Sequence, residues 1–351
     1  MTKISAFATH GPTERLGPFT FDARPVGAND VRIAIRYCGV CHSDLHQAKN
    51  EWGGSIYPMV PGHEIVGHVA EVGAEVTRFA VGDPVGVGCM VESCRTCGSC
   101  SHGEEQYCEN GGTFTYNSRY ADGSPAYGGY AKAITVNQDF VLKIPKNLPL
   151  DAAAPLLCAG VTMWSPISHW KIGAGHEVGV VGLGGLGHMA VKLAKARGAR
   201  VTQFTTSPNK VEDARRLGAD DVVVTRDPSA IAALGRRFDF ILDTVSAPHD
   251  LNALLGSLKT GGSLILVGLP DQPPTIYPGL LVTRRRSLSG SMIGGIRETQ
   301  EMLDFCGEHG ITSDIELIPM QAINEAYERM LKNDVKYRFV IDLASLAPAD
   351  G

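Results

Sequence analysis

The sequence lacks any uninterrupted apolar stretch near the roughly 20 residues that a membrane-spanning helix needs. It also lacks an excess of basic residues, since 32 lysines and arginines stand against 37 acidic residues, for a formal net charge of −5. Nucleic-acid-binding proteins usually present a basic face, so this balance argues against a nucleic-acid partner. Charged residues make up only 20% of the chain and hydrophobic residues 44%, which favours a globular protein over a disordered one.

Residues 1–10 lack the apolar core of a secretory signal, and we therefore expect a cytoplasmic protein that does not associate with a membrane. At roughly 150 residues per domain, the length of 351 residues suggests two domains. The 41 glycines and 20 prolines favour many tight turns and argue against a helical bundle.

Four of the nine cysteines, Cys94, Cys97, Cys100 and Cys108, stand close together in a loop-like segment. Nine is an odd number, and disulfides are rare in the cytoplasm, so a disulfide framework is not expected. Four thiolates on one loop suit a tetrahedral structural zinc site, whose binding energy would stabilise a lobe without a core of its own. The alternatives are idle thiols and an iron–sulfur cluster, which usually has a last gap of three residues followed by proline.

A second set of metal-ligand residues, Cys41, His63 and Cys158, lies on three segments that are far apart in the chain. One histidine and two cysteines match the alcohol-dehydrogenase type of catalytic zinc site, which leaves a fourth position for water or substrate. Spacing alone does not show that these segments meet. Taken singly, Cys158 has the alternative of a buried thiol and His63 that of a structural histidine. We interpret Cys38 as structural despite its C-x2-C spacing with Cys41.

The character of the chain changes near residue 151. Before it, short β-like runs such as 31–35 and 64–72 are broken by glycine and proline, which predicts an irregular antiparallel domain. After it, apolar runs alternate with helical patterns, as in parallel βαβ units. We expect an α/β protein with a catalytic domain of residues 1–152 and 292–351 and a dinucleotide-binding domain of residues 153–291 built on a doubly wound parallel sheet. In the dinucleotide-binding domain we expect strands at 177–181, 201–204, 222–224, 238–242 and 263–267 and a helix at 188–197, and a further strand near 288–293 leads back to the first domain. The tail of the chain is expected to hold helices at 297–308 and 323–333 and a last strand at 338–342.

A glycine-rich turn follows the first strand of the second domain and opens a helix, which is the context that a G-x-G-x-x-G motif requires. Its glycines allow a tight turn, close approach of a pyrophosphate and close packing of the helix on the strand. The helix N-terminus then favours the phosphate charge. The alternative is a glycine-rich turn without a ligand. The turn consists of Gly182, Leu183, Gly184, Gly185, Leu186 and Gly187.

The end of the next strand predicts the choice of cofactor. NAD-binding folds usually place an acidic residue there to accept a hydrogen bond from the ribose 2′-hydroxyl, but no acidic residue stands between Val201 and Val211. Hydroxyl groups and a cation instead suit a 2′-phosphate, so we expect NADP(H) to be preferred over NAD(H). The alternative is that Lys210 is only a solvated residue at a helix start. The expected phosphate-binding segment comprises Thr205, Thr206, Ser207, Asn209 and Lys210.

Together these motifs resemble those of the zinc-dependent medium-chain alcohol dehydrogenases, in particular the cinnamyl alcohol dehydrogenase branch, which includes bacterial broad-range aldehyde reductases. The resemblance covers nearly the whole chain and implies a GroES-like β-rich catalytic domain, a Rossmann domain and two zinc ions. It also implies a homodimer or homotetramer. It is carried by segments 39–46, 57–64, 94–108, 154–162 and 332–339.

The resemblance implies roles for individual residues. Cys41, His63 and Cys158 would bind the catalytic zinc, and Glu64 would coordinate it when the substrate position is empty. Asp44 would orient His63, although a helix-capping role is a serious alternative. Ser43 would contact the substrate oxygen and His46 would end the proton relay, with the cofactor ribose between them. Further cofactor contacts are implied for His42, Thr162, Thr244, Gly268, Ser291, Met292 and Ile293.

The substrate pocket is expected to include Trp52, Met59, Phe114 and Met292, each of which has a plain core position as its alternative. Departures from plant relatives at Phe114 and Met292 argue against monolignol specificity and favour a wide range of aromatic and aliphatic aldehydes. The small-molecule substrate would be a primary alcohol or an aldehyde, and the NADP(H) preference makes aldehyde reduction the expected direction. The alternatives are a polyol or secondary alcohol dehydrogenase of the same fold and a non-enzymatic zinc-thiolate redox sensor.

Overall fold

The computed structural model describes residues 2–227, 229–270 and 272–347, and these form two compact units. The first unit contains residues 1–161 and 294–351, and the second contains residues 162–293. The first boundary falls inside helix α4 (Ala159–His169), so residues 153–161 lie in the first unit, although the sequence placed them in the second. The reason is local packing, because residues 153–157 bury their side chains in the first unit, next to strand β3.

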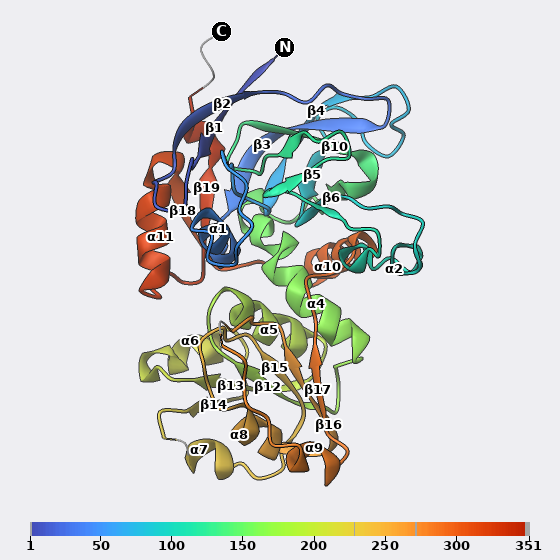
Figure 1. The fold of residues 1–351 in the computed structure, drawn as a ribbon. Helices are drawn as coiled ribbons and strands as arrows, with labels where there is room; N and C mark the ends of the chain where they lie inside the picture. The colour runs from blue at the N-terminus through green and yellow to red at the C-terminus, as the bar shows by residue number, and fades with distance from the viewer. Residues whose placement is uncertain (1, 228, 271, 348–351) are drawn as a thin grey trace. The chain divides into compact units, whose positions relative to one another are not determined.

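The first unit is built around a mixed sheet with the strand order β11-β5-β4-β3-β19-β18, in which β10 also pairs with β3 (Figure 1). Strand β3 (Asp30–Gly39) is central because it pairs with β4, β10 and β19, all antiparallel. Val31, Ile33 and Ile35 alternate along it and are buried, which follows the period of two of a strand. The other strands are β1 (Lys3–Ala8), β2 (Gly17–Asp22), β4 (Ile65–Val72), β5 (Pro84–Val87), β6 (Met90–Glu92), β7 (Thr113–Phe114), β8 (Ser118–Arg119), β9 (Pro125–Ala126), β10 (Ala133–Asn137), β11 (Leu142–Lys143), β18 (Ile315–Pro319) and β19 (Arg338–Asp342).

Short helices connect these strands and carry the residues of interest. Helix α10 ends at a left-handed Gly310, as helices commonly do. The helices of this unit are α1 (His42–Ala48), α2 (Gly98–Ser101), α3 (Leu150–Ala153), α10 (Ile296–His309) and α11 (Ile323–Leu331), with 3-10 turns η1 (Glu105–Tyr107), η2 (Gln138–Phe140), η3 (Ala154–Leu157), η5 (Met320–Ala322) and η6 (Leu343–Ser345).

The second unit is a six-stranded parallel sheet with the order β14-β13-β12-β15-β16-β17. The chain starts in the middle, at β12, builds outward to β14 and then crosses to the other side of β12. Such a reversal marks the point where ligands bind in open α/β sheets. The strands are β12 (Glu177–Val181), β13 (Arg200–Thr205), β14 (Asp221–Val224), β15 (Phe238–Asp243), β16 (Leu258–Leu266) and β17 (Ser287–Gly290).

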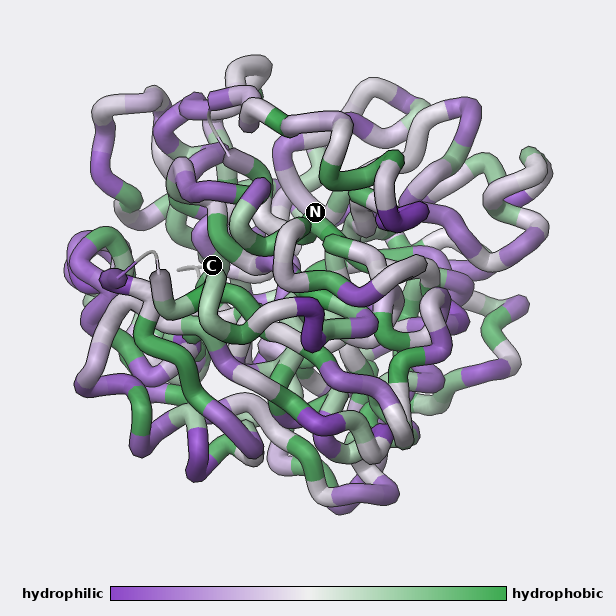
Figure 2. Tube along the Cα trace, turned by 90° about the horizontal axis from the view of Figure 1, so that it is seen from below, coloured by the Kyte–Doolittle hydropathy of each residue, from purple (hydrophilic) through white to green (hydrophobic). Residues whose placement is uncertain are grey.

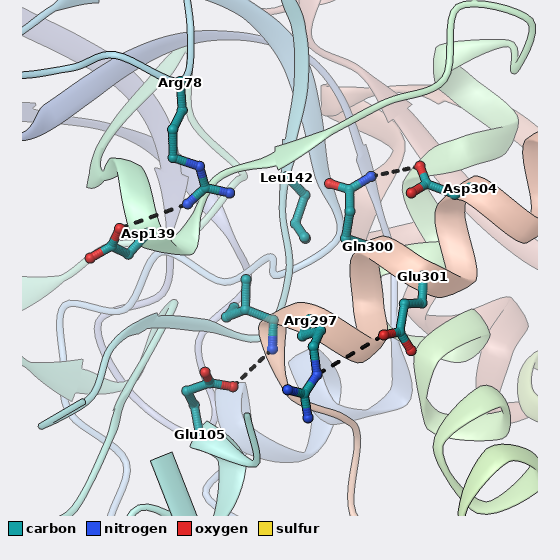
Figure 3. Close-up of a pocket in the computed structure, with 9 residues that line it drawn as sticks. Arg78, Glu105, Asp139, Leu142, Arg297, Gln300, Glu301 and Asp304 are labelled. Atoms are coloured by element: carbon teal, nitrogen blue, oxygen red, sulfur yellow. Dashed lines mark hydrogen bonds and ion pairs between the residues drawn. The ribbon is translucent and has the colours of Figure 1, made fainter. Parts of the chain in front are cut away.

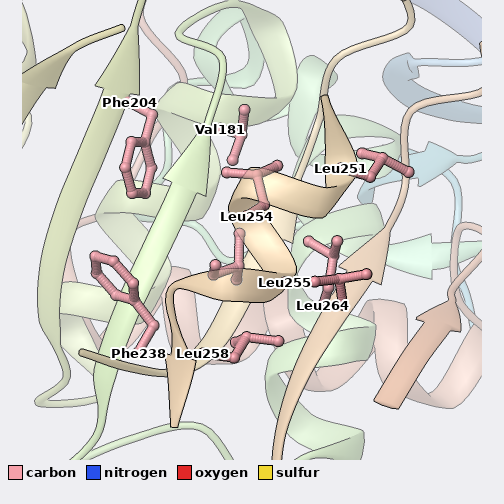
Figure 4. Close-up of a cluster of buried hydrophobic side chains, with 9 residues drawn as sticks. Val181, Phe204, Phe238, Leu251, Leu254, Leu255, Leu258 and Leu264 are labelled. Atoms are coloured by element: carbon pink, nitrogen blue, oxygen red, sulfur yellow. The ribbon is translucent and has the colours of Figure 1, made fainter. Parts of the chain in front are cut away.

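The core of the second unit forms where helix α8 (Leu251–Gly256) meets the sheet. Leu254 and Leu255 of α8 join Phe204 and Phe238 of the strands in one buried cluster (Figure 4). A parallel sheet needs such a cover because its faces are apolar. The remaining helices are α5 (Gly185–Ala196), α6 (Val211–Arg216), α7 (Ser229–Ala232) and α9 (Gly279–Val282), with the 3-10 turn η4 (Pro208–Lys210).

Several elements differ in length from their predicted ranges. Helix α5 begins at Gly185 instead of residue 188, because the last glycines of the turn already adopt helical geometry. Strand β16 begins at Leu258 instead of residue 263, and β17 ends at Gly290, so 291–293 lie beyond the strand. These differences lie at element ends, where sequence patterns are weakest.

Hydrophobic and hydrophilic stretches alternate along the trace of the chain (Figure 2). Within the described residues, no single helix is long and apolar enough to cross a bilayer. The bent pair Leu150–Leu157 and Ala159–His169 meets the criteria of length and composition only when its two helices are counted together.

Candidate active site

Helix α1 begins at Cys41, and the carboxylate of Asp44 organises this helix start. Asp44 is 0% exposed and accepts four hydrogen bonds. Its Oδ2 accepts from the backbone N–H of Cys41 at 2.9 Å and from the Tyr130 hydroxyl at 3.2 Å. Its Oδ1 accepts from the backbone N–H of Gly62 at 3.1 Å and from His63 Nδ1 at 3.0 Å. The carboxylate of Asp44 therefore caps the helix and also orients His63. These are the two roles that the sequence had left as alternatives for this residue.

Three distant segments bring four potential metal ligands together in the first unit. Cys41 lies at the start of α1, His63 and Glu64 lie just before β4, and Cys158 lies between η3 and α4. One ligand atom from each residue lies within 4.8 Å of those from the others, and all four residues are buried. With Nδ1 of His63 donating to Asp44, Nε2 is left to bind a metal. We name this cluster the buried ligand set.

The environment of the Cys41 thiol in the buried ligand set suits a cation. Cys41 Sγ lies 4.0 Å from Cys158 Sγ and 3.6 Å from Ser43 Oγ. The pKa of Cys41 is held well below its usual value, first by the hydrogen bond with Cys158 and then by the positive charge of Arg338, although burial opposes this. Metals bind the thiolate form, so this environment fits zinc.

Glu64 gives a direct test of whether a cation fits the site. Its side chain is 0% exposed, and within the described part of the chain neither carboxylate oxygen accepts a hydrogen bond. Arg338 of β19 approaches its Oε1 to 3.3 Å. Burial raises the pKa of Glu64 to about 8, and Arg338 opposes this rise. A buried carboxylate without a donor needs a partner, and a zinc ion held by the other three ligands would supply one.

Ser43 and His46 lie on the first turns of α1, next to the buried ligand set. The ring of His46 stacks on Trp52, with 5.0 Å between centroids, and its Nδ1 pairs with Glu51. His42 begins the same helix, and its ring centroid lies 6.3 Å from that of His46. The helix therefore carries a hydroxyl beside Cys41 and an imidazole that is held by an exposed carboxylate.

Sequence reasoning missed three residues at this site. Arg338 was placed in a strand and in the segment 332–339 that carries the resemblance, but it was given no role at the site, and Glu51 was not singled out. Cys89 was counted but not assigned, although its thiol exchanges a hydrogen bond with Cys158. The distance along the chain hides each of these contacts except that of Glu51, which lies five residues from His46 and is acidic.

The loop of four cysteines forms a second potential metal site, which we name the loop ligand set. Sulfur atoms of Cys94, Cys97, Cys100 and Cys108 lie within 4.8 Å of one another. Backbone N–H groups point at the sulfurs: Cys97 donates to Cys94 Sγ at 3.3 Å and Glu109 donates to Cys97 Sγ at 3.4 Å. Hydrogen bonds, first from the Thr96 backbone, lower the pKa of Cys94 to about 5. Such hydrogen-bond donors stabilise thiolates, and four cysteine thiolates suit a structural zinc site.

The loop ligand set is joined to helix α10 beside an open cavity of ≈ 390 Å³ (Figure 3). Glu105, which lies between the third and fourth cysteines, accepts from the backbone N–H of Ile296 at 3.0 Å. The Arg297 guanidinium donates to the carbonyl of His102. The charged side chains that line this cavity are largely paired with each other, as Arg78 is with Asp139 at 3.7 Å. The cavity therefore reflects how the loop is fixed and is not the candidate active site.

In the second unit, each of three positions in the turn after β12 favours glycine for a different structural reason. Gly182 has φ of +89°, and a Cβ there would meet Thr244 Oγ1 at 2.8 Å. A Cβ on Gly187 would lie 2.0 Å from the carbonyl oxygen of Gly182, so this glycine allows the helix to pack on the turn. A Cβ on Gly184 would meet no atom within 4 Å, which leaves the turn open at the start of α5. The turn therefore fits a dinucleotide pyrophosphate.

The segment after β13 differs from the prediction at Thr205. This residue is 5% exposed, and its Oγ1 accepts the backbone N–H of Ser207 at 3.1 Å. Residues 201–205 of β13 are all buried, so Thr205 does not offer its hydroxyl to a ligand as expected. Thr206 is exposed, Ser207 is half-buried, and Asn209 is exposed. Lys210 Nζ donates to the carbonyl of Leu183 at 2.9 Å, in the glycine-rich turn.

The other residues expected at the cofactor follow the carboxyl ends of neighbouring strands. Thr244 follows β15 and donates its hydroxyl to the Val181 carbonyl at 2.7 Å, while Gly268 follows β16. Ser291, Met292 and Ile293 follow β17. Thr162 is buried in α4. Apart from Thr162, these positions share one edge of the sheet with the glycine-rich turn, which is where doubly wound folds bind ligands.

Of the residues expected in the substrate pocket, the structure contradicts Met59. Its side chain is 2% exposed, and its backbone pairs with Thr9, so it belongs to the core of the first unit. Trp52 and Phe114 are exposed in the first unit, and Met292 is exposed in the second. The three exposed residues stay predictions.

Comparisons with known proteins agree with this geometry. Residues 27–146 match the family described as the alcohol dehydrogenase GroES-like domain, and residues 185–308 match that described as zinc-binding dehydrogenase. The NADP-dependent alcohol dehydrogenase C 1 of Mycolicibacterium smegmatis is 56% identical over 347 residues, covering 99% of both chains. The aldehyde reductase YahK of Escherichia coli is 54% identical over 351 residues, covering 98% of this chain and 99% of that one.

A solved structure of a cinnamyl alcohol dehydrogenase from Sorghum bicolor superposes with a TM-score of 0.96 at 47% identity, covering 99% of this chain and 100% of that one. The predicted fold class and the predicted enzyme class are confirmed by these matches, and the non-enzymatic sensor is not favoured. By its two ligand sets, its dinucleotide turn and these similarities, the chain belongs to the zinc-binding alcohol dehydrogenase family.

Proposed function

We propose that this enzyme interconverts primary alcohols and aldehydes, aromatic, cinnamyl-type and aliphatic, with NADP(H), and that it works mainly as an aldehyde reductase. The observation that carries the proposal is the buried ligand set beside the Ser43 hydroxyl. Two thiols and an imidazole converge there, and the buried Glu64 carboxylate has no hydrogen-bond donor within the described residues. Three such ligands with an adjustable fourth position are typical of catalytic zinc.

We assign the following roles to the residues of the two ligand sets. Cys41, His63 and Cys158 hold the catalytic zinc, and the four cysteines of the loop ligand set hold a second zinc. When bound, zinc polarises the substrate oxygen as a Lewis acid, and the nicotinamide supplies or accepts hydride. Asp44 keeps Nδ1 of His63 protonated and its ring fixed, so that Nε2 stays basic.

Proton movement is assigned to helix α1. Ser43 Oγ, beside Cys41, donates a proton to the substrate oxygen during aldehyde reduction and accepts one during alcohol oxidation. His46, held through Nδ1 by Glu51 at the surface, exchanges protons with solvent. Glu64, balanced by Arg338, can approach the metal position when no substrate is there.

The NADP(H) preference is supported by the segment after β13. None of the residues 202–210 is acidic, so no carboxylate there repels a 2′-phosphate. The hydroxyl groups of Thr206 and Ser207, together with basic side chains near them, are suitable hydrogen-bond donors to a 2′-phosphate. Relatives named NADP-dependent alcohol dehydrogenase share more than half of their residues with this chain.

The test is a set of initial rates with the purified, zinc-loaded enzyme. NADPH and NADH oxidation would be compared with cinnamaldehyde, benzaldehyde and a straight-chain aldehyde as substrates. We expect rapid NADPH turnover with all three aldehydes and much slower NADH turnover. Turnover with only one aldehyde would contradict the broad pocket, and equal rates with both cofactors would contradict the NADP(H) preference. No turnover at full zinc occupancy would overturn the proposed reaction.

We also propose a homodimer or homotetramer in the cytoplasm. Strand β17 ends the sheet order of the second unit, and an edge strand can pair with another chain. Exposed apolar residues such as Tyr277 and Val282 lie in the segment before β17. The cytoplasmic location is supported by the zinc-thiolate sites, which need reduced cysteines. Sedimentation of the purified enzyme would give the oligomeric state.

A further inference from the structure

Strands β13 and β14 are neighbours in the parallel sheet, so the segments after them lie side by side. The backbone N–H of Thr225 donates to the Thr205 carbonyl at 2.9 Å, which continues the pairing beyond the strand ends. One residue further on, Arg226 Nε donates to the carbonyl oxygen of Thr206, also at 2.9 Å. The guanidinium of Arg226 is therefore fixed on the segment that the sequence assigns to the cofactor phosphate.

Two of the other candidate phosphate-binding groups in this segment, Thr205 and Lys210, are directed elsewhere. The Thr205 hydroxyl is buried and accepts a hydrogen bond from Ser207. Lys210 Nζ donates to Leu183 in the glycine-rich turn, on the side of the pyrophosphate. Thr206 is exposed, and the only hydrogen bond found for Arg226 among the described residues is the one from Nε to Thr206. A guanidinium has five N–H donors, so its two terminal nitrogens keep theirs for a ligand.

We propose that Arg226 binds the 2′-phosphate of NADP(H) and is a specificity-determining residue for this cofactor. The inference rests on the NADP(H) preference of the proposed function and adds a cation that the motif after β13 does not contain. A planar guanidinium fixed through Nε can present both terminal nitrogens to phosphate oxygens, which favours two parallel hydrogen bonds. The neighbouring acid, Asp227, is turned to the backbone N–H of Ser229, from which it accepts at 2.9 Å.

The test measures binding of nucleotide fragments, independent of turnover. Isothermal titration calorimetry on the full zinc-loaded chain would compare 2′,5′-ADP, which carries the 2′-phosphate, with 5′-AMP, which lacks it. For Arg226→Ala we expect roughly ten-fold weaker binding of 2′,5′-ADP, because a charged hydrogen bond at an exposed site is lost, and unchanged binding of 5′-AMP. Arg226→Lys should recover part of the loss, since it keeps the charge without the planar fork.

Arg236→Ala is the matched control. Arg236 is also an exposed arginine of the second unit, but it stands before β15, at the amino ends of the strands. Its removal changes the net charge equally and should leave the affinity for both fragments within two-fold. If Arg226→Ala and Arg236→Ala weakened 2′,5′-ADP equally, the effect would be one of net charge, and the proposal would fail.

The remaining outcomes separate this inference from the proposed function. If wild type prefers 2′,5′-ADP over 5′-AMP and Arg226→Ala keeps that preference, Arg226 is not a phosphate ligand, while the NADP(H) preference stands. If Arg226→Ala weakens both fragments equally, the arginine only holds the segment in place, and the assignment is overturned. If wild type binds both fragments equally, the NADP(H) preference itself fails, and the inference fails with it.

Discussion

The two ligand sets of the first unit are built in opposite ways. The loop ligand set takes all four sulfurs from one stretch of 15 residues, 94–108, and only Cys100 among them is buried. The buried ligand set collects its members from three segments between residues 41 and 158, and all four are buried. The first set can be recognised from spacing alone, whereas the second exists only once the sheet has formed.

The groups that surround the two sets also differ in whether they come from nearby or from distant parts of the chain. Backbone N–H groups from the loop itself point at the sulfurs of the loop ligand set. The buried ligand set depends on side chains from elsewhere, namely Asp44 on His63 and Arg338 on Glu64. A site supported by local backbone is suited to holding a metal for stability, and a site supported by distant side chains can be tuned for chemistry.

The largest loss of turnover is expected from Cys158→Ala, which tests whether the buried ligand set is the catalytic one. Removing one of three ligands should lower turnover at least roughly a thousand-fold, because a catalytic metal stabilises the reacting charge by several kcal/mol. NADPH binding, measured by fluorescence titration, should be largely retained, since the dinucleotide turn lies in the other unit. Cys306→Ala removes a buried thiol that belongs to neither ligand set and serves as the control. Unchanged turnover in Cys158→Ala would remove Cys158 from the site.

A smaller effect is expected from Asp44→Asn, which keeps the size of the side chain but removes its charge. Zinc affinity or turnover should fall by about 10–100-fold, as is usual for the hydrogen-bond partners of metal ligands. The measurement is zinc occupancy under competition with a chelator. Asp250→Asn is the control, because Asp250 caps α8 in the second unit through the Asn252 N–H at 2.9 Å and touches no metal ligand. An equal loss of zinc in both variants would reduce Asp44 to a helix cap.

The smallest effect on turnover is expected from Cys97→Ser in the loop ligand set. This variant should bind one zinc per chain instead of two and keep most of its turnover at low temperature. Its melting temperature should fall by roughly 10 °C, because the energy of a structural metal is folding energy. Metal analysis and calorimetry test both expectations. Two zincs per chain with unaltered melting would break the contrast between a structural and a catalytic set.

The fold could be predicted from sequence wherever a pattern is local. The strand, turn and helix from Glu177 to Ala196 follow directly from an apolar run, three spaced glycines and a helical period. The start of β16 at Leu258 was missed because Gly261 and Gly262, which interrupt its first half, read as a turn. Sequence patterns report the preference of a segment, and neighbouring strands can overrule it.

The site could be predicted as far as residue types and short spacings allow. The four-cysteine loop needs no fold to be seen, and the resemblance placed Cys41, His63 and Cys158 together. Burial was the missing information at Thr205 and Met59, whose hydroxyl and thioether face the core. The pairing of Arg338 with Glu64 joins residues more than 270 positions apart, and neither segment contains a sequence pattern that predicts this contact.

The pairing of Arg338 with Glu64 also bears on how the protein is made. The loop ligand set is complete once Cys108 has left the ribosome, whereas the counter-charge of Glu64 is translated about 230 residues later. At about 5–20 residues per second, this interval is on the order of 10–50 s. The nascent chain can thus capture its first zinc during synthesis, but the environment that governs the second is assembled only as translation nears residue 338.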